Sequence, residues 1–326
     1  MQRAYLTQYG NPSDGVTVRD DPAPEAPKKG QVLVDIVGAS INPAELLLIQ
    51  GVYASKPPLP APFGIECAGK VVAIGDDVTG LSVGDLVLCL PRENWAQQML
   101  FDAAEVIALP AGVDPLQASM LKVNPATALM MLRDMRNMTA GDWVVQNAAN
   151  SAVGRCLIRL AKTMGLNTIN LVRRESLVAD LTGEGADVVL VDGPDIAARV
   201  KETVDGNRSL AIDAVGGEAT LRLADCLSDE GLIVNYGLLS GQPCQLGAEQ
   251  AIFRSISLRG FWLAKELRTM APDAVRDLYR GLAQQVLDGH LAVPVEATYT
   301  LNDIGAALDH AMRDGRDGKI LLTPNA

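Results

Sequence analysis

Between residues 141 and 264 the sequence repeats one pattern, in which a short apolar run is followed by a segment with helical spacing. The runs are apolar almost throughout, which is typical of strands buried on both faces of a parallel sheet. Helices between such strands cover both faces of the sheet. The pattern predicts a doubly wound α/β domain with strands at 142–149, 167–173, 187–192, 209–216, 231–237 and 255–264.

The first 115 residues are rich in Val, Ile, Gly and Pro and predict a β-rich domain, with strands at 31–41, 69–75 and 84–90. Helical spacing follows at 115–135, with an interruption at Pro125. A chain of 326 residues has room for about two domains. The tail holds only a helix at about 271–288 and a strand at 318–323, so we expect it to return to the first domain.

The composition excludes several classes of protein. With a net charge of −11, the chain is a poor candidate for binding nucleic acid. No apolar run reaches the roughly 18 residues of a membrane span, and no apolar segment opens the chain as a signal peptide would. Five scattered cysteines without a CxxC pair fit reduced, mostly buried thiols, so we expect a cytoplasmic protein.

The stretch WVVQNAANSAVG, residues 143–154, joins a strand to a helix where a dinucleotide-binding domain has its glycine-rich turn. Ser151 suits a helix N-cap, Ala152 is small, and Gly154 lets the helix pack closely on the strand. The alternative is an ordinary turn, in which asparagine tolerates the geometry. The ordered series of strands and helices favours a cofactor loop formed by Asn147, Asn150, Ser151, Ala152, Val153 and Gly154.

The second strand of this region ends at Arg173, 19 residues after Gly154. An acidic residue at about this spacing would bind the ribose of NAD. Arg173 and Arg174 suit the 2′-phosphate of NADPH instead, because guanidinium groups form charge-assisted bonds with phosphate. A solvated strand end is the alternative reading of the two arginines.

The chain resembles the medium-chain dehydrogenase/reductase superfamily, in its zinc-free, quinone-reductase-like branch. It is most similar there to the mitochondrial-type 2-enoyl thioester reductases. The resemblance covers nearly the whole chain and is carried by QNAANSAVG followed by TINLVR, and by INPAELLLIQGVY (41–53), PLP (58–60), VNPATA (123–128) and LRGFWL (258–263). It implies a GroES-like catalytic domain formed by residues 1–115 and 265–326, and an NADPH-binding Rossmann domain formed by 116–264.

The chain departs from the enoyl reductases at three places. Ala152 and Lys122 stand where they usually have glycine, and a lysine at the second place is found in quinone reductases. The segment 91–98 is shorter than its counterpart. These departures bear on the substrate and leave the expected cofactor unchanged.

The zinc-dependent members of the superfamily bind their metal through a GHE motif and further Cys and His ligands. The matching stretch FGIECAG (63–69) has Ile65 in place of the histidine, and the only histidines are His290 and His310. A catalytic zinc needs three protein ligands. We therefore expect no metal, with Glu66 and Cys67 as core residues.

Reduction of a C=C bond conjugated to a carbonyl remains possible without zinc. It needs a hydrogen-bond donor for the enolate oxygen and a proton for the α-carbon. The resemblance implies that Tyr53 is this donor and that Asn42 orients Tyr53 or the nicotinamide ribose. A core tyrosine and an Asn-Pro turn are the alternatives.

The remaining candidate residues are expected around the cofactor. Tyr236 and Gly237 end a strand at the carboxyl edge of the sheet, where ligands bind in such folds. The resemblance implies that Thr127 lies against the nicotinamide. Phe261, Trp262 and Leu263 are candidates for a wall of the nicotinamide and acyl pocket, and ordinary core packing is the alternative. Lys319 is a weaker candidate, since a solvated strand-edge lysine is the alternative.

We therefore expect an NADPH-dependent reductase of α,β-unsaturated acyl thioesters, carried on CoA or on acyl carrier protein. The main alternative is an NADPH:quinone or enone reductase with the same fold. A non-enzymatic NADPH-binding sensor is a third possibility, although it would not need Tyr53. Homodimers are common in the family, so a homodimer is also expected.

Overall fold

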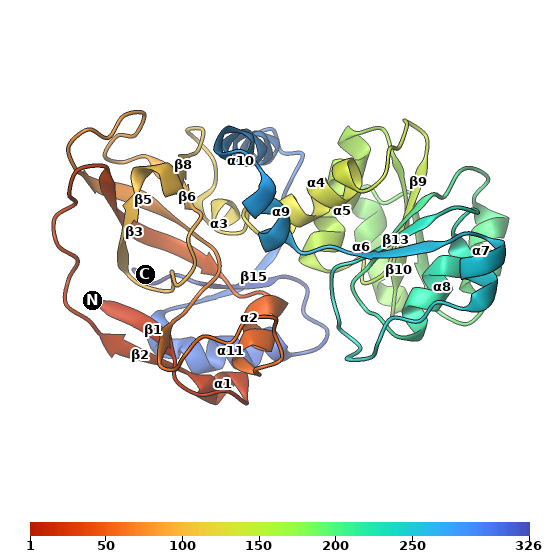
Figure 1. Ribbon diagram of the computed structural model, residues 1–326, viewed down its shortest axis with the longest axis horizontal. Helices are drawn as coiled ribbons and strands as arrows, with labels where there is room; N and C mark the ends of the chain where they lie inside the picture. Colours follow the sequence, from red (N-terminus) through yellow and green to blue (C-terminus); the bar gives the residue numbers. More distant parts are fainter. The chain divides into compact units, whose positions relative to one another are not determined.

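The computed structural model describes residues 1–326 and divides the chain into two compact units (Figure 1). Unit 1 comprises Met1–Val123 and Pro272–Ala326, and unit 2 comprises Asn124–Ala271. The chain leaves unit 1 after residue 123, eight residues later than the sequence suggested. It returns to unit 1 at residue 272, seven residues later than suggested. The first shift follows from residues after 115 that stay with unit 1: the amide of Val123, for example, donates to Glu66 over 2.9 Å.

Unit 1 is built around a seven-stranded sheet of order β15-β16-β3-β5-β6-β8, in which β7 also pairs with β3, and a three-stranded sheet of order β2-β1-β4. The C-terminal strand β16 runs antiparallel to β3, with Leu321 opposite Ser40. The tail therefore completes the sheet that the N-terminal part begins. Its elements are β1 (Gln2–Leu6), α1 (Pro12–Gly15), β2 (Val16–Asp20), β3 (Gln31–Ser40), α2 (Pro43–Ile49), β4 (Ala61–Pro62), β5 (Cys67–Ile74), β6 (Leu86–Cys89), β7 (Gln98–Asp102), η1 (Ala103–Glu105), β8 (Val106–Ala108), α3 (Pro115–Ala118), α10 (Pro272–Leu287), β15 (Val295–Tyr299), η4 (Leu301–Asp303), α11 (Ile304–Met312) and β16 (Lys319–Leu322).

Unit 2 confirms the predicted doubly wound fold. Its six strands are all parallel, in the order β11-β10-β9-β12-β13-β14, so the strand order reverses between β9 and β12. Its elements are α4 (Asn124–Asp134), β9 (Trp143–Gln146), α5 (Ala152–Thr163), β10 (Asn167–Val172), η2 (Glu175–Leu177), α6 (Val178–Gly183), β11 (Val188–Val191), α7 (Ile196–Thr203), β12 (Leu210–Asp213), α8 (Glu218–Cys226), β13 (Leu232–Asn235), η3 (Glu249–Phe253), β14 (Ser257–Gly260) and α9 (Leu263–Thr269).

Two local predictions are wrong. The strand expected at 255–264 ends at Gly260, and Leu263 begins helix α9. Pro125 does not interrupt a helix: the break lies between α3 and α4, and Pro125 is in the first turn of α4. A proline is tolerated there because the first amides of a helix have no intrahelical partner.

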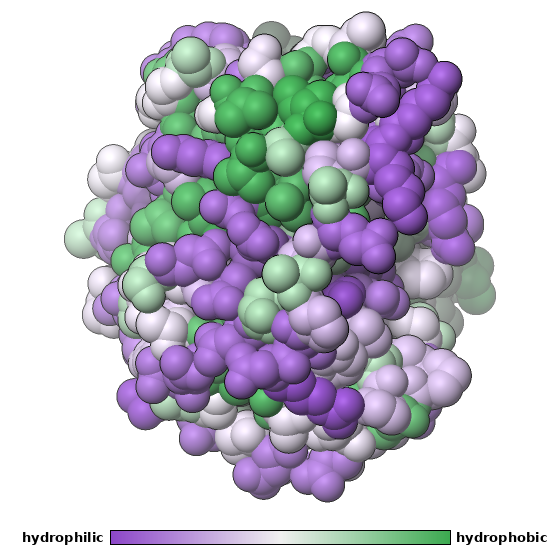
Figure 2. Space-filling model, turned by 90° about the vertical axis from the view of Figure 1, so that its left-hand side faces the viewer, coloured by the Kyte–Doolittle hydropathy of each residue, from purple (hydrophilic) through white to green (hydrophobic).

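The surface and the thiols agree with a folded protein of this composition. Four of the five cysteines are buried, and all five are free. No helix combines the length and the apolar character needed to cross a membrane. Figure 2 shows one face of the molecule, on which hydrophobic residues gather in the upper half and hydrophilic residues cover most of the rest.

The core of unit 1 contains a cluster of buried ionisable side chains. Glu45, in the first turn of α2, accepts bonds from the amides of Asn42 (3.1 Å) and Ile65 (3.2 Å). Glu45 and Glu66 are both fully buried. Burial, reinforced by the nearby charge of Glu66, raises the pKa of Glu45 to about 7. The folded protein therefore holds a proton on Glu45 at a pH where an unfolded chain has released it.

This difference predicts a pH-dependent stability. Between about pH 4.5 and 7 the folded state binds more protons at Glu45 than the unfolded state, so the free energy of unfolding falls as the pH rises through that window. One such carboxyl contributes a slope of up to about 1.4 kcal/mol per pH unit. Glu45→Gln should lack this contribution, as measured by urea unfolding at pH 5 and pH 7.

The exposed Glu25 provides the control, since Glu25→Gln should keep the wild-type slope. Equal slopes in wild type and Glu45→Gln would contradict the raised pKa.

Candidate functional site

The turn before α5 has the geometry of a phosphate-binding loop. Ser151 is the N-cap of α5, in an extended conformation, and its Oγ accepts a bond from the amide of Gly154 over 3.1 Å. A Cβ on Gly154 would lie 2.4 Å from the carbonyl oxygen of Ala149. Only glycine lets the helix begin this close to the strand end, and the N-terminal amides of such a helix attract anions.

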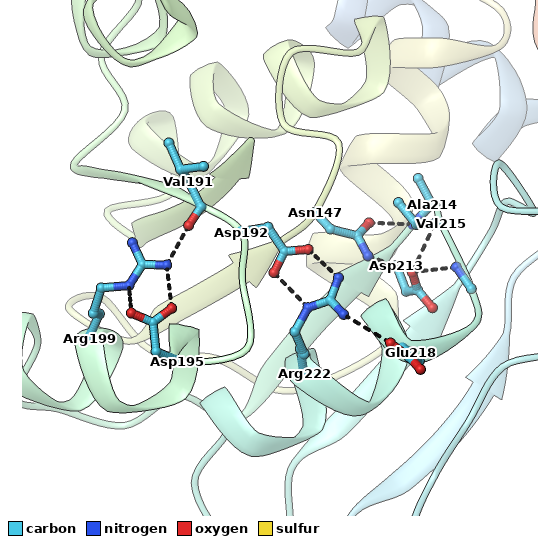
Figure 3. Close-up of polar contacts among 11 residues, drawn as sticks. Asn147, Val191, Asp192, Asp195, Arg199, Asp213, Ala214, Val215, Glu218 and Arg222 are labelled. Carbon is cyan, nitrogen blue, oxygen red and sulfur yellow. Dashed lines mark hydrogen bonds and ion pairs between the residues drawn. The ribbon is translucent and has the colours of Figure 1, made fainter. Parts of the chain in front are cut away.

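The residues of this turn divide by burial. Ser151 and Ala152 are half-buried, whereas Asn147 is buried at the end of β9. The Asn147 side chain donates to Asp213 over 2.6 Å and accepts from the amide of Ala214 over 2.8 Å (Figure 3). Asn147 therefore joins two strand ends. The sequence suggested a contact with the cofactor; the bonds of this side chain described above lie within unit 2.

Asn150 and Val153 have lesser parts in the loop. The carbonyl oxygen of Asn150 accepts a bond from Nε of Arg155 over 3.2 Å, and Val153 is buried. Arg155 was not among the sequence candidates. It is a buried cation that pairs with Glu184 and, over 2.6 Å, with Asp180, so it ties the loop to α6. The spacing gave no signal for it, because Arg155 lies opposite the apolar face of the predicted helix.

Arg173 and Arg174 are exposed directly after β10. Two other arginines lie near the end of the neighbouring strand β11 and bond to groups there (Figure 3). Arg222 forms a two-pronged ion pair with Asp192, at 2.8 and 2.6 Å. Arg199 donates to the carbonyl oxygen of Val191 over 2.6 Å and also bonds Asp195. Arg173 and Arg174 are more exposed than these two arginines.

The end of β13 lies close to both β12 and the loop. Burial raises the pKa of Tyr236, and the Ser151 side chain lies close enough to the Tyr236 hydroxyl to oppose this shift. A Cβ on Gly237 would lie 2.6 Å from the carbonyl oxygen of Ala214, so this approach also requires glycine. The structure therefore brings Ser151, Tyr236 and Gly237 together at the carboxyl edge of the sheet.

The other candidates of unit 2 lie at different depths. Thr127 is buried in α4. Phe261 is buried after β14, and its amide donates to the carbonyl oxygen of Asn235 over 2.8 Å. Trp262 is exposed, with the guanidinium of Arg268 5.3 Å from its ring centre, and Leu263 is half-buried.

The candidates of unit 1 lie around the start of α2. Asn42 is the buried N-cap of this helix. The side-chain nitrogen of Asn42 donates to Glu66 over 2.7 Å, and its side-chain oxygen accepts from Lys319 over 2.7 Å. Lys319 is buried and also donates to the carbonyl oxygen of Ile41 over 2.6 Å. It is therefore not a solvated strand-edge lysine. Tyr53 is half-buried after α2 and packs against the apolar core of the unit.

The stretch that resembles the zinc motif is occupied by core contacts. Cys67 and Cys89 lie opposite each other on β5 and β6, and burial raises the pKa of the Cys89 thiol well above its usual value. The ammonium of Lys122 donates to the carbonyl oxygen of Ile65. No three His, Cys, Asp or Glu side chains gather as metal ligands would.

Family models cover most of the two units. Residues 28–117 match an alcohol dehydrogenase GroES-like domain, and residues 152–279 match a family described as zinc-binding dehydrogenase. Together these matches confirm the predicted combination of a GroES-like and a Rossmann-type domain.

Individual proteins match over nearly the whole chain. The mitochondrial enoyl-[acyl-carrier-protein] reductase of Caenorhabditis elegans is 35% identical over 96% of this chain and 94% of its own. A putative NADPH:quinone reductase from Bacillus thuringiensis superposes with a TM-score of 0.89, at 28% identity over 99% of this chain and 98% of its own. Etr1p, solved with NADP and crotonyl-CoA, superposes with a TM-score of 0.86, at 25% identity and 99% coverage of both chains. An Etr1p/Etr2p heterodimer from Candida tropicalis is also similar, with a TM-score of 0.85 at 26% identity over 99% of both chains.

The expected cytoplasmic location is contradicted by these comparisons, because the curated relatives that match nearly the whole chain are mitochondrial enzymes. The expectation rested on free, buried cysteines. Free cysteines indicate reducing conditions and do not identify the compartment that supplies them.

The loop of α5, the strand ends around it and the full-length sequence similarity lead to the same conclusion. The chain belongs to the medium-chain dehydrogenase/reductase superfamily, in the family of the mitochondrial enoyl-[acyl-carrier-protein] reductases.

Proposed function

We propose that the protein reduces the C=C bond of 2-enoyl thioesters, with the acyl group on CoA or on acyl carrier protein, and uses NADPH. The observation that carries this proposal is the phosphate-binding turn of Ser151 and Gly154, followed at the next strand end by two exposed arginines. The relatives named enoyl-[acyl-carrier-protein] reductases support the choice of substrate.

In unit 2 the residues bind and orient the dinucleotide. The amides at the start of α5 bind the pyrophosphate, and Arg173 with Arg174 bind the 2′-phosphate. Tyr236 lies beside Ser151, and the close approach of Gly237 to Ala214 allows no side chain at that strand end. NADPH, when bound, supplies the hydride that reaches the β-carbon of the enoyl group.

In unit 1 the Tyr53 hydroxyl donates a hydrogen bond to the thioester carbonyl or a proton to the α-carbon. The charge that develops on the oxygen as hydride arrives needs such a donor. Asn42 holds the start of α2, the helix that precedes Tyr53, through its bonds to Glu66 and Lys319. Its side chain is thus engaged within unit 1, and we assign it a positioning role.

A quinone or enone reductase is the second candidate. Its support is the similarity to the putative NADPH:quinone reductase, together with Lys122 at the place where quinone reductases also have lysine. The two candidates share the hydride donor and differ in the acceptor. A sensor without activity is disfavoured, because the Tyr53 position is retained.

We also propose a homodimer formed along β14. This strand is the edge of the sheet, and all four of its residues are exposed. The amides of Ser257 and Phe261 bond toward β13, so strand alternation directs the amide of Leu258 outward. Ile252 (68% exposed) and Phe253 (79% exposed) precede the strand. An edge with unpaired amides and large apolar residues is a natural place for a second copy.

Tyr53→Phe tests the mechanism, because it removes only the hydroxyl. We expect kcat for crotonyl-CoA and a longer enoyl-CoA to fall by about 10²–10⁴-fold, while the Kd for NADPH is unchanged. Reduction of 1,4-benzoquinone should fall much less, because the reduced quinone is stabilised and water can protonate it. NADPH oxidation is measured with all three acceptors side by side.

The half-buried Tyr5, which belongs to another part of unit 1, provides Tyr5→Phe as a control for loss of a phenolic hydroxyl. Turnover of Tyr53→Phe within about twofold of wild type on enoyl thioesters would refute the donor role. Faster turnover of the quinone than of either thioester by the wild type would favour the second candidate.

The two arginines test the cofactor preference. Replacing Arg173 and Arg174 with alanine removes charge-assisted contacts worth about 1.5–3 kcal/mol, so NADPH should bind about ten- to a hundredfold more weakly. NADH binding should hardly change. Titration of both cofactors by tryptophan fluorescence measures this, with Arg259→Ala, at the opposite edge of the sheet, as the control. Equal use of NADH and NADPH by the wild type would rule out the 2′-phosphate site.

Leu258→Pro tests the dimer. The substitution removes one outward amide and leaves the bonds between β14 and β13 in place. We expect a dimer for wild type and a monomer for the variant by light scattering after gel filtration, whereas Leu258→Ala, which keeps the amide, remains largely dimeric. A wild-type monomer, or a proline variant that stays dimeric, would exclude this interface.

A further inference from the structure

The sequence candidates omit Asp213, the last residue of β12, although its carboxylate is fully buried between strand ends. One carboxylate oxygen, Oδ1, accepts three bonds: from the Asn147 side chain (2.6 Å) and from the amides of Val215 (2.9 Å) and Gly216 (3.0 Å). Figure 3 shows Asp213 beside Asn147, Ala214 and Val215. This oxygen therefore fixes both the end of β9 and the turn that follows β12.

The other oxygen, Oδ2, faces α8 and β13. It accepts a bond from the hydroxyl of Thr220 over 2.6 Å and one from the Asn235 side chain over 3.1 Å. Asn235 also donates to the carbonyl oxygen of Gly237 over 3.0 Å. The same carboxylate thus reaches the close approach of β13 to β12.

These five donors are all neutral, and they come from four segments of unit 2: the end of β9, the turn after β12, α8 and β13. A buried charge without a cation is tolerated only when hydrogen bonds satisfy it. The backbones of β9, β12 and β13 are already paired, so the carboxylate adds a second link between the ends of these strands.

The bonded groups are neighbours of the proposed dinucleotide contacts. Asn147 leads into the loop that ends at Ser151, and Tyr236, next to Asn235 in the sequence, lies beside Ser151. Gly237 follows directly. A shift of the carboxylate would therefore move the two sides of the phosphate-binding turn relative to each other.

We infer that Asp213 is a positioning residue for the dinucleotide: it holds the ends of β9, β12 and β13 in the arrangement that binds NADPH. This inference rests on the proposed function. We assign Asp213 no direct contact with the cofactor. It fixes the groups that contact the cofactor, so cofactor binding depends on Asp213 and the chemical step does not.

Asp213→Asn is the direct test, because it keeps the shape and replaces one acceptor oxygen with a donor NH2 group. That group must then face either backbone amides or the side chain of Asn235, and at least one donor loses its partner. We expect the Kd for NADPH, measured by fluorescence titration without substrate, to rise about ten- to a hundredfold. At saturating NADPH, kcat should stay within about threefold of wild type.

Asp142→Asn is the matched control. Asp142 immediately precedes β9 at its amino end, away from the proposed site, and likewise accepts several bonds, from the amide and hydroxyl of Thr139 and from Asn207. It should lower the thermal unfolding midpoint without weakening NADPH binding.

Thr220→Val and Thr220→Ser keep the inference testable if Asp213→Asn does not fold. Valine removes the hydroxyl that bonds Oδ2 and serine retains it, so we expect NADPH binding to weaken severalfold in the first variant and to be preserved in the second. Folding of each variant is checked by its thermal unfolding midpoint.

Wild-type affinity in folded Asp213→Asn or Thr220→Val, or a loss of kcat with unchanged affinity, would overturn the positioning role. Failure of the wild type to bind NADPH at all would instead refute the proposed function, so the two failures are distinguishable.

Discussion

The proposed cofactor site depends on one close approach, in which the first turn of α5 lies against the backbone of Ala149. A Cβ on residue 154 would lie 2.4 Å from the Ala149 carbonyl oxygen, a distance that real side chains do not adopt. The glycine therefore determines where the helix starts and where its N-terminal amides point. The usual glycine-rich turn is reduced here to this one essential position, and Ser151 supplies the capping bond that fixes the turn.

In unit 1 the main constraint is the burial of charged side chains next to the proposed catalytic segment. Glu45, Glu66 and Lys319 are buried together. The side-chain amide of Asn42 connects Glu66 to Lys319, and the backbone amide of Asn42 donates to Glu45. Desolvating such groups is costly unless each finds a partner. Because Lys319 comes from the C-terminal strand and Asn42 from the N-terminal part, the same bonds also fasten the two ends of the chain to each other.

Sequence reasoning succeeded where the signal was local and failed where it depended on distant partners. Alternation of apolar strands and helices is local, so the doubly wound sheet was predictable, whereas the exact strand ends were not. The bond from Lys319 to Asn42 spans 277 residues, and no spacing rule indicates it. Asp213 was visible as an acidic residue after an apolar strand, but its five donors are contributed by side chains and turns that only the fold brings together.

Burial separates the predicted site residues into two groups with different roles. Asn147, Asn42 and Lys319 are buried and use their polar atoms within their own unit, so contact with a ligand would first break bonds worth about 1–3 kcal/mol each. Ser151 and Ala152 are half-buried, and Arg173 and Arg174 are exposed. The residue type at a family position does not show whether its side chain is buried or accessible. Asparagine, for example, suits both a contact with a ligand and a hydrogen bond between two strand ends. We therefore propose that the first group holds the site and that the second group binds the dinucleotide.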